Sequence, residues 1–229
     1  MLIQRIAVRE TNCYLLRGEA GTVLVDPGPP SGAAQVIAET QCAGCAAGDI
    51  RLIVVTHGHL DHFGAVAAVK AWCGAPVGAY RDEPASSRDP RYALPPAGTI
   101  RGSLFRWAYL ALHPLLRFPP LEIDIALDEG DSLAPYGVDA TIWRVPGHAS
   151  GSLAVVTAES DAFVGDLIVN YTVPSRPLYI ADAAAWQRSY ESILALQPRM
   201  VYVGHGEPFH GEKLRHIYPA RYQLRWWVH

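Results

Sequence analysis

Short apolar runs that end in turn residues recur along the chain and predict buried β-strands. Residues 2–8 and 12–17 form two such runs, and Thr22–Val25 is closed by a stretch rich in Pro and Gly. The run Ile50–Thr56 is almost continuously apolar, as is typical of a strand that is covered on both faces. Further strands are predicted at residues 131–135, 140–145, 152–157, 161–165 and 200–203.

Apolar residues spaced three or four apart predict helices between these strands. Helices are expected over residues 33–41 and Phe63–Cys73, and a third over residues 183–196, where Trp186 and Tyr190 share one stripe. Helices and strands are intermixed along the chain. The fold class is therefore α/β or α+β, with helices layered on sheet.

Residues 81–125 interrupt this pattern and are interpreted as an insertion into a single domain of residues 1–229. Residues 81–100 are rich in Pro and Gly and predict a loop, whereas residues 101–118 are apolar and aromatic and predict a helix broken near Pro114. The segment could pack as core, cover a substrate cleft as a lid, or form the surface of a homodimer.

Composition and charge exclude several classes of protein. With 229 residues, 50% hydrophobic and 18% charged, the chain has the make-up of a globular rather than a disordered protein. A net charge of −3 does not suggest a nucleic-acid partner. No apolar block approaches the roughly 20 residues of a membrane span, and the N-terminus lacks a signal-peptide pattern. Cys42 and Cys45 have no second pair for a zinc ribbon, so we expect a cytoplasmic protein with ordinary thiols.

Histidine is the residue type that points to chemistry. The chain has nine His residues, and the run HGHLDH at residues 57–62 places three imidazoles and a carboxylate directly after the strand Ile50–Thr56. Imidazole and carboxylate are ligands for zinc, iron and manganese. Because alternate residues diverge along an extended loop, these four side chains favour two neighbouring ions over one.

Three further candidate ligands each follow a predicted strand and lie next to glycine: His148, Asp166 and His205. Glycine lets the backbone approach a crowded centre, so we expect these side chains to join residues 57–62. The other histidines are interpreted as surface or core residues, although His210 lies only five residues after His205; they are His113, His210, His216 and His229.

These motifs together resemble those of the metallo-β-lactamase superfamily. H-x-H-x-D-H is followed by G-H-x-x-G-S, G-D and G-H-G, and the segments Thr11–Leu16 and Val23–Gly28 are similar to the opening strands of its glyoxalase II-like branch. The resemblance covers about residues 2–80 and 130–210. It implies a four-layer αββα sandwich with a dinuclear metal site at one edge.

The resemblance also implies a role for each candidate ligand. A first metal would be held by His57, His59 and His148, a second by Asp61, His62 and His205, and Asp166 would bridge them. The ions are expected to be zinc, with iron or manganese as alternatives. Two such ions lower the pKa of a bridging water enough to give a hydroxide nucleophile. Asp61, which could orient that nucleophile or pass a proton to the leaving group, and Asp166 are the candidate catalytic residues, and Asp26 would support the ligand loop.

Departures from other branches narrow the expected reaction. Metallo-β-lactamases commonly carry Cys where Asp166 stands, which disfavours antibiotic hydrolysis. Flavo-diiron proteins carry Glu in place of His59, which disfavours that branch as well. Tyr171 does not stand at the offset of the lactonase tyrosine, and only about 20 residues follow His210, fewer than the glutathione-binding extension of glyoxalase II needs. We expect a hydrolase of a small ester, thioester or lactone. The alternatives are a mononuclear iron oxygenase of the persulfide dioxygenase type and a non-catalytic metal-binding protein.

Overall fold

The computed structural model describes residues 1–83, 107, 111 and 121–217 of the chain. Most of the expected insertion at residues 81–125, including nearly all of the apolar segment 101–118, lies outside the described residues. Its roles as lid, dimer surface or core therefore stay predictions.

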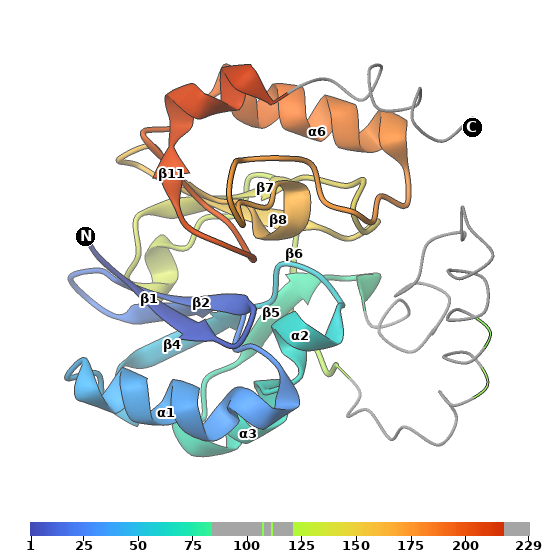
Figure 1. Cartoon of the computed structure of the whole chain (residues 1–229). Helices are drawn as coiled ribbons and strands as arrows, with labels where there is room; N and C mark the ends of the chain where they lie inside the picture. Colours follow the sequence, from blue (N-terminus) through green and yellow to red (C-terminus); the bar gives the residue numbers. More distant parts are fainter. Residues whose placement is uncertain (84–106, 108–110, 112–120, 218–229) are drawn as a thin grey trace.

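Two sheets face each other in the centre of the molecule (Figure 1). The first sheet has the strand order β1-β2-β3-β4-β5-β6, antiparallel from β1 to β3 and parallel from β3 to β6. Its strands are β1 (Leu2–Val8), β2 (Thr11–Arg17), β3 (Thr22–Val25), β4 (Ile50–Val54), β5 (Val77–Tyr80) and β6 (Ile125–Leu127).

The second sheet has the order β11-β10-β9-β8-β7, in which only β9 and β10 are parallel neighbours. Its strands are β7 (Ala140–Arg144), β8 (Leu153–Thr157), β9 (Asp161–Phe163), β10 (Met200–Tyr202) and β11 (Phe209–His210).

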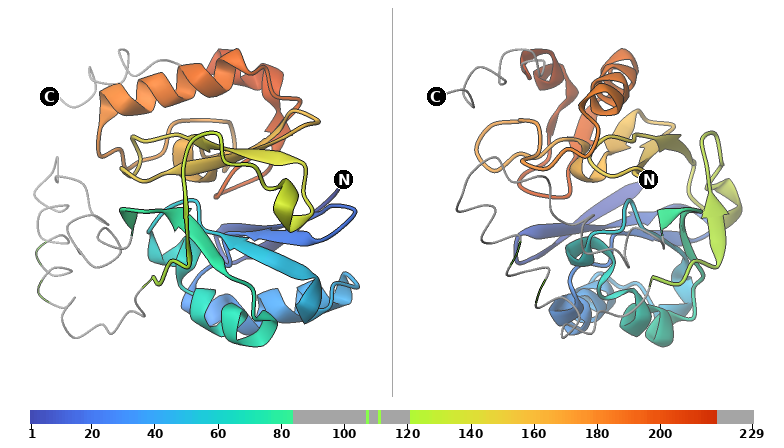
Figure 2. Two further views of the ribbon diagram at one scale, coloured as in Figure 1. Left: turned by 180° about the vertical axis from the view of Figure 1, so that it is seen from behind. Right: turned by 90° about the vertical axis from the view of Figure 1, so that its right-hand side faces the viewer.

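Helices cover the outer face of each sheet, as the views in Figure 2 show. The first sheet is covered by α1 (Ala33–Cys42) and α3 (Val66–Cys73), and the second by α6 (Ala183–Ala195) and a 3-10 helix at Gly211–His216. The resulting order of layers confirms the predicted αββα sandwich. Among the described residues, none of the helices has the length and apolar character that crossing a membrane requires.

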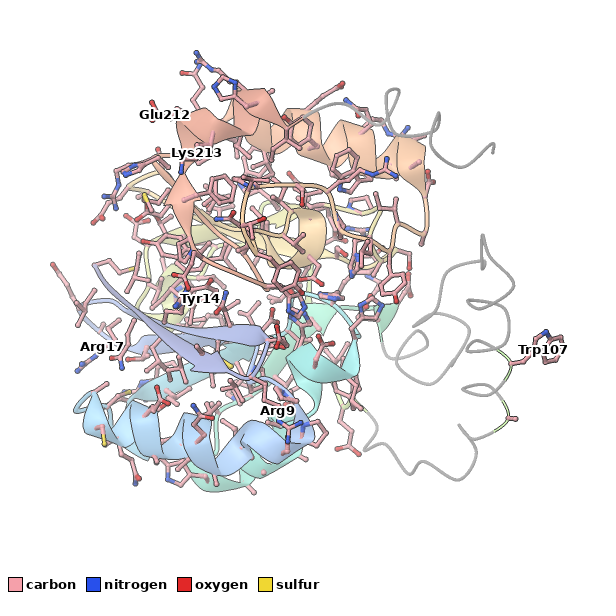
Figure 3. The ribbon with its side chains drawn as sticks, in the orientation of Figure 1. Arg9, Tyr14, Arg17, Trp107, Glu212 and Lys213 are labelled. Carbon is pink, nitrogen blue, oxygen red and sulfur yellow. The ribbon has the colours of Figure 1, made fainter. Side chains whose placement is uncertain are left out.

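The period of two along each strand explains why this arrangement forms. In β2, Cys13 and Leu15 pack under α1 and α3, whereas Tyr14 and Leu16 pack between the two sheets. Figure 3 shows the Tyr14 side chain lying between the sheets, where its ring meets Phe163 edge to face with ring centroids 5.2 Å apart. Both faces of the strand are thus buried, which is the reason for its continuous apolar run.

Two predicted elements differ from the observed ones. The strand expected at residues 131–135 is wrong: a single bridge at Ser132 leads into a 3-10 helix at Ala134–Tyr136. Pro135 cannot donate to a strand ladder, and Gly137, with φ +84°, ends the helix in a left-handed conformation. The helix expected at Phe63–Cys73 is split, because a short helix, α2 (Leu60–Phe63), precedes α3. Two candidate ligands, Asp61 and His62, therefore lie on a helix rather than in a loop.

Candidate metal centre

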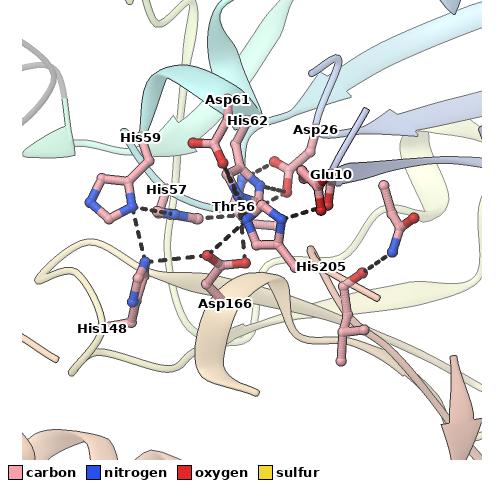
Figure 4. A network of polar contacts seen from close by, with 12 residues as sticks. Glu10, Asp26, Thr56, His57, His59, Asp61, His62, His148, Asp166 and His205 are labelled. Atoms are coloured by element: carbon pink, nitrogen blue, oxygen red, sulfur yellow. Dashed lines mark hydrogen bonds and ion pairs between the residues drawn. The ribbon is translucent and has the colours of Figure 1, made fainter. Parts of the chain in front are cut away.

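The seven predicted ligands come together at one edge of the sandwich (Figure 4). Those of the HGHLDH run follow β4 on the first sheet, whereas His148, Asp166 and His205 follow β7, β9 and β10 of the second. They form two groups, within each of which one ligand atom per residue lies within 4.8 Å of the others. The first group is His57, His59, His148 and Asp166, and the second is Asp61, His62 and His205.

Three imidazole nitrogens converge in the first group. His59 Nδ1 lies 3.0 Å from His57 Nε2 and 3.0 Å from His148 Nε2. These spacings fit nitrogens that share one tetrahedral ion, whose bonds to imidazole are about 2.0–2.1 Å long.

The second group brings two imidazoles against a carboxylate. His62 Nε2 and His205 Nε2 are 3.3 Å apart, and Asp61 Oδ2 is 3.2 Å from His205 Nε2 and 3.7 Å from His62 Nε2. The Asp61 side chain is 46% exposed, so this group opens toward solvent.

Asp166 lies between the two groups. Its Oδ2 is 3.5 Å from His148 Nε2 and 3.3 Å from His205 Nε2, and its Oδ1 is 3.4 Å from His62 Nε2. The carboxylate thus faces ligands of both groups at once, as the bridging position requires.

Hydrogen bonds on the outer side of the rings determine the tautomers of His148 and His205. His148 Nδ1 donates to the Tyr179 carbonyl at 2.7 Å, and His205 Nδ1 donates to the Glu10 carbonyl at 2.6 Å. A carbonyl oxygen can only accept, so the Nδ1 of each ring carries a proton and its Nε2 presents a lone pair to the centre.

Asp26 determines the tautomers of the other two outer-bonded rings. Its carboxylate accepts from the Thr56 hydroxyl at 2.7 Å and from His62 Nδ1 at 2.9 Å. Because the Thr56 hydroxyl proton is used on Asp26, the Thr56 oxygen accepts from His57 Nδ1 at 3.0 Å. Lone pairs on His57 Nε2 and His62 Nε2 therefore also point inward, and Asp26 supports the ligand loop as the resemblance implies.

Ring nitrogens that face inward 3.0–3.3 Å apart are the observation that tests whether metal ions fit. In the neutral forms of His62 and His205 the proton is on the outer Nδ1, so the lone pairs of their Nε2 atoms face each other at 3.3 Å. Such lone pairs repel unless a cation, either a proton or a metal ion, lies between them, and the raised pKa values of both rings reflect this demand for positive charge. The donor set and its geometry therefore fit two divalent ions.

Burial and charge tune the ionisation of the two groups differently. Burial lowers the pKa of His57 and His148, and that of His59 to about 4, so these rings are neutral at physiological pH, as candidate ligands need to be. Burial would also lower the pKa of His205, but its hydrogen bonds to Asp166 and Asp61 raise it to about 10.

The two carboxylates of the centre are ionised. Burial opposes this, but His62 and His205 outweigh it and hold the pKa of both Asp61 and Asp166 below the usual range. The ionised carboxylates and the neutral His57, His59 and His148 are in the protonation states that metal binding requires. Burial would lower the pKa of His62, but Asp166 and Asp61 raise it, so His62 and His205 would each have to release a proton when an ion binds.

Glycines beside the ligands allow the close approach that the sequence predicts. A Cβ at Gly204 would overlap Asp166 Oδ1 and His62 Cε1, and one at Gly147, with φ +136°, would overlap the backbone of Trp186. Any side chain at these two positions would displace the ligands or the helix behind them.

Some parts of the centre leave no signal in the sequence. The carbonyls of Glu10 and Tyr179 that orient two ligands belong to the backbone, which any residue type supplies. Tyr171, set aside in the sequence on its spacing, stacks on His205 with ring centroids 6.0 Å apart. Glu83 touches the ligand loop through the amide of Gly58, although it falls in the segment interpreted as an insertion.

Comparison with known sequences agrees with the family that the motifs resemble. The model of the metallo-beta-lactamase superfamily matches residues 6–205. The chain is 29% identical to a probable metallo-hydrolase of Bacillus subtilis over 93% of this chain and 87% of that protein. It is 27% identical to a probable metallo-hydrolase of Methanocaldococcus jannaschii over 86% of this chain and 88% of that protein.

Solved structures share the same architecture. A protein crystallised in a di-iron-bound form matches with a TM-score of 0.68 and 26% identity over 96% of this chain and 99% of the other. A B3 metallo-beta-lactamase matches with a TM-score of 0.73 and 23% identity over 96% and 99% of the two chains, a level at which only the fold is shown to be shared.

Proposed function

This chain belongs to the metallo-β-lactamase superfamily, and from that membership we propose that it is a hydrolase using two divalent metal ions to cleave a small ester, thioester or lactone. The related proteins described as probable metallo-hydrolases and the cluster of His and Asp side chains support a metal-dependent hydrolase. The glyoxalase II-like branch, the ester-type substrate and zinc as the resident metal are the finer parts of the proposal.

The observation that carries the proposal is the inward convergence of five imidazoles and two carboxylates in two adjacent groups. His57, His59 and His148 would hold one ion, Asp61, His62 and His205 the other, and Asp166 would contact both. Two bound divalent ions would lower the pKa of a water enough to supply hydroxide as the nucleophile at neutral pH, and they would also act as a Lewis acid on the carbonyl oxygen.

Protein side chains would supply orientation and proton transfer. Asp61 is half-exposed on the cavity side of the centre, and because its pKa is lowered it is ionised and accepts hydrogen bonds. From this position it would orient the attacking water and, once protonated by it, deliver the proton to the leaving oxygen or sulfur. Asp166 would hold the spacing of the two ligand groups.

Metal analysis combined with a substrate panel tests the proposal. We expect about two ions per chain, as dinuclear hydrolases carry, and metal-dependent turnover of at least one ester, thioester or lactone in a panel that also contains phosphodiesters and persulfides. Asp166→Ala is expected to lose bound metal, whereas the exposed Asp139→Ala serves as a matched control. One iron per chain with oxygen uptake on a glutathione persulfide would instead establish the oxygenase alternative.

The non-catalytic alternative makes a different prediction. If the centre only stabilised the fold, Asp61→Ala and His148→Ala would lower stability without changing any measurable turnover. We expect both variants to lose turnover.

A further inference from the structure

The loop between β9 and α6 presents apolar side chains beside the candidate metal ligands. Leu178 is 92% exposed, Tyr171 59% and Tyr179 42%. All three line a cavity of about 700 Å³ that also contacts His59, Asp61, His148, Asp166 and His205. Exposed apolar side chains grouped at a polar centre mark a binding surface.

Both ends of this loop are fixed to the ligand-bearing loops. Asn170 N donates to the His205 carbonyl at 2.9 Å, and Asp182 N donates to the Gly147 carbonyl at 3.0 Å. Near its start, Val169 and Ser175 exchange two backbone hydrogen bonds of 3.0 and 2.9 Å. The apolar side chains are therefore held at a set position relative to the centre.

The charges that line the cavity disfavour polyanionic substrates. Among the described residues that line it, Arg176 is the only Lys or Arg, and it is accompanied by Glu10, Asp61 and Asp166. A polyphosphate or a polyanionic thiol conjugate would find few cationic partners apart from the metal ions themselves.

We propose that this cavity selects esters, thioesters or lactones whose acyl group is apolar and packs on Leu178 and Tyr171. The inference rests on the proposed hydrolase function and adds the substrate class. Each methylene that is fully buried on binding raises the binding constant by up to about fourfold. Because the wall is open on one side, we expect the binding constant to rise by about twofold per methylene.

The test uses two measurements on the zinc-loaded protein. Hydrolysis of a series of thioesters from acetyl to octanoyl is expected to rise in kcat/KM by about twofold per methylene. Binding of acetate, butanoate and octanoate, followed by calorimetry, is expected to show the same trend without turnover. Leu178→Ser should flatten both series, whereas Leu2→Ser, at a 58% exposed leucine on β1, should change neither.

The outcomes separate the two claims. A flat dependence on chain length in both measurements overturns the apolar wall while leaving the hydrolase intact. Absence of turnover across the series, with binding still dependent on chain length, overturns the hydrolase and leaves the wall standing.

A second observation, independent of the cavity, concerns Glu83. This side chain is fully buried, and its Oε1 accepts a hydrogen bond from the backbone amide of Gly58, between the candidate ligands His57 and His59. Burying a carboxylate is costly unless its contacts compensate. Here one of those contacts is made to the ligand loop itself.

Glu83 also packs against the loop that carries His148. A Cβ added at Gly151 would overlap Glu83 Oε2, so the carboxylate lies directly on the backbone of that glycine. One side chain therefore lies against both loops of the first ligand group. We infer that Glu83 is a positioning residue that sets the distance between these loops and thereby the affinity of the first metal site.

Three single variants and one double variant test this role through metal affinity rather than turnover. Glu83→Ala is expected to weaken the binding of one of the two ions by about 10- to 100-fold, the range seen when outer contacts of metal ligands are removed. Glu83→Gln keeps an acceptor for Gly58 and should retain both ions. Gly151→Ala should reproduce the loss by pushing Glu83 away. In the double variant with Glu83→Ala the effects should not add, because the overlap is gone.

Competition with a chromophoric chelator gives the two affinities, and thermal unfolding of the metal-free variants gives the matched structural readout. Glu129→Ala, at an exposed carboxylate bonded to the amide of Arg144, is the control. If Glu83→Ala or Gly151→Ala lowers the metal-free melting temperature but leaves both affinities unchanged, the positioning role is wrong.

Discussion

At the scale of single residues, the centre depends on where each imidazole carries its proton. Asp26 is fully enclosed and accepts three hydrogen bonds, two from Thr56 and one from His62. It also holds a left-handed backbone with φ +51°, a conformation that Asp and Asn tolerate better than other side chains. This carboxylate thus links the start of the ligand loop to the second ligand group.

Asp26→Asn is expected to abolish binding at the second group with little change in fold. Asn keeps the left-handed backbone, but its NH₂ group would face His62 Nδ1. Both groups would then be donors, so the hydrogen bond that holds His62 would be lost. His62 would then carry its proton on Nε2, where the ligand lone pair belongs.

Metal stoichiometry and the far-UV circular dichroism spectrum check this prediction. We expect a loss of about one ion per chain with an unchanged spectrum, whereas the exposed control Asp139→Asn should keep both ions. Two tightly bound ions in Asp26→Asn would show that the tautomer of His62 is not set by Asp26.

The side chains of this centre were predictable from the sequence, whereas their outer partners were only partly so. The seven ligand candidates are His or Asp residues that follow a predicted strand, the three outside residues 57–62 each lie next to glycine, and the structure brings all seven together. The carbonyls of Glu10 and Tyr179 and the carboxylate of Glu83 reach the centre only because the chain folds back on itself. Their positions depend on packing between segments far apart in the chain.

At the scale of elements, helix α6 supports the candidate ligand Asp166 from behind. Trp186 is fully buried, its indole Nε1 donates to the Leu167 carbonyl at 2.8 Å, and its ring stacks on Tyr190 with centroids 5.4 Å apart. Leu167 directly follows Asp166, so this hydrogen bond anchors the turn that presents the bridging candidate.

Trp186→Phe is expected to destabilise the protein by about 1–3 kcal/mol, because a buried carbonyl loses its donor and a cavity is left. Denaturant unfolding of the metal-free protein measures this loss, and Arg188→Ala on the exposed face of α6 is the control. A loss no larger than that of the control would mean that the turn at Leu167 is held by other contacts.

The start of α6 gives a prediction about pH. Asp182 caps the helix by accepting from Ala185 N at 3.0 Å and Ala184 N at 2.9 Å, and these hydrogen bonds lower its pKa. A lowered folded-state pKa means that the contribution to stability is present above the unfolded value of about 3.9 and is lost as pH falls through the folded value.

Asp182→Ala should therefore lower the melting temperature at pH 7, and the difference from the unchanged protein should shrink as pH falls below about 4. Thermal unfolding of the metal-free forms at several pH values measures it. A difference that stays constant down to pH 2 would show that the ionised carboxylate is not what stabilises the cap.

Most elements followed from apolar periodicity, but the short strands β5, β6 and β11 were not predicted, and two predicted elements differ for local reasons. In place of the strand expected at residues 131–135, Pro135 and Gly137 favour a 3-10 helix. The pattern of apolar residues does not indicate this turn. The helix expected at Phe63–Cys73 is replaced by α3 from Val66 and by a separate short helix, α2, whose turn lies among the polar residues of the HGHLDH run, where apolar periodicity does not indicate it. This turn lets Asp61 and His62 face the second group while His57 and His59 belong to the first.

At the scale of the whole molecule, the centre joins the two sheets. The HGHLDH run comes from the first sheet, and His148, Asp166 and His205 come from the second. The alternation of buried strands and amphipathic helices predicted the α/β or α+β class, whereas the four-layer αββα order was implied by the family resemblance. Residues 84–106, 108–110 and 112–120 lie outside the description, so the insertion stays a prediction from its composition.

Because ligands from both sheets would share each ion, removal of the metal should weaken the whole sandwich. An ion present at 1,000 times its dissociation constant stabilises the folded state by about 4 kcal/mol, which corresponds to a fall of roughly 10 °C in melting temperature on chelation. His210→Ala should keep this shift, since His210 lies outside both ligand groups. A chelator that leaves the melting temperature unchanged would contradict the joining role.

Titration of the metal-free protein with zinc, while thioester hydrolysis is followed, tests the central claim most directly. The claim is that two ions held by seven side chains make one hydrolytic centre. We predict that turnover reaches its maximum at about two equivalents of zinc and that Asp166→Ala shows no such rise. Full activity at one equivalent, or a rise with two equivalents in Asp166→Ala equal to that of the unchanged protein, would contradict the account.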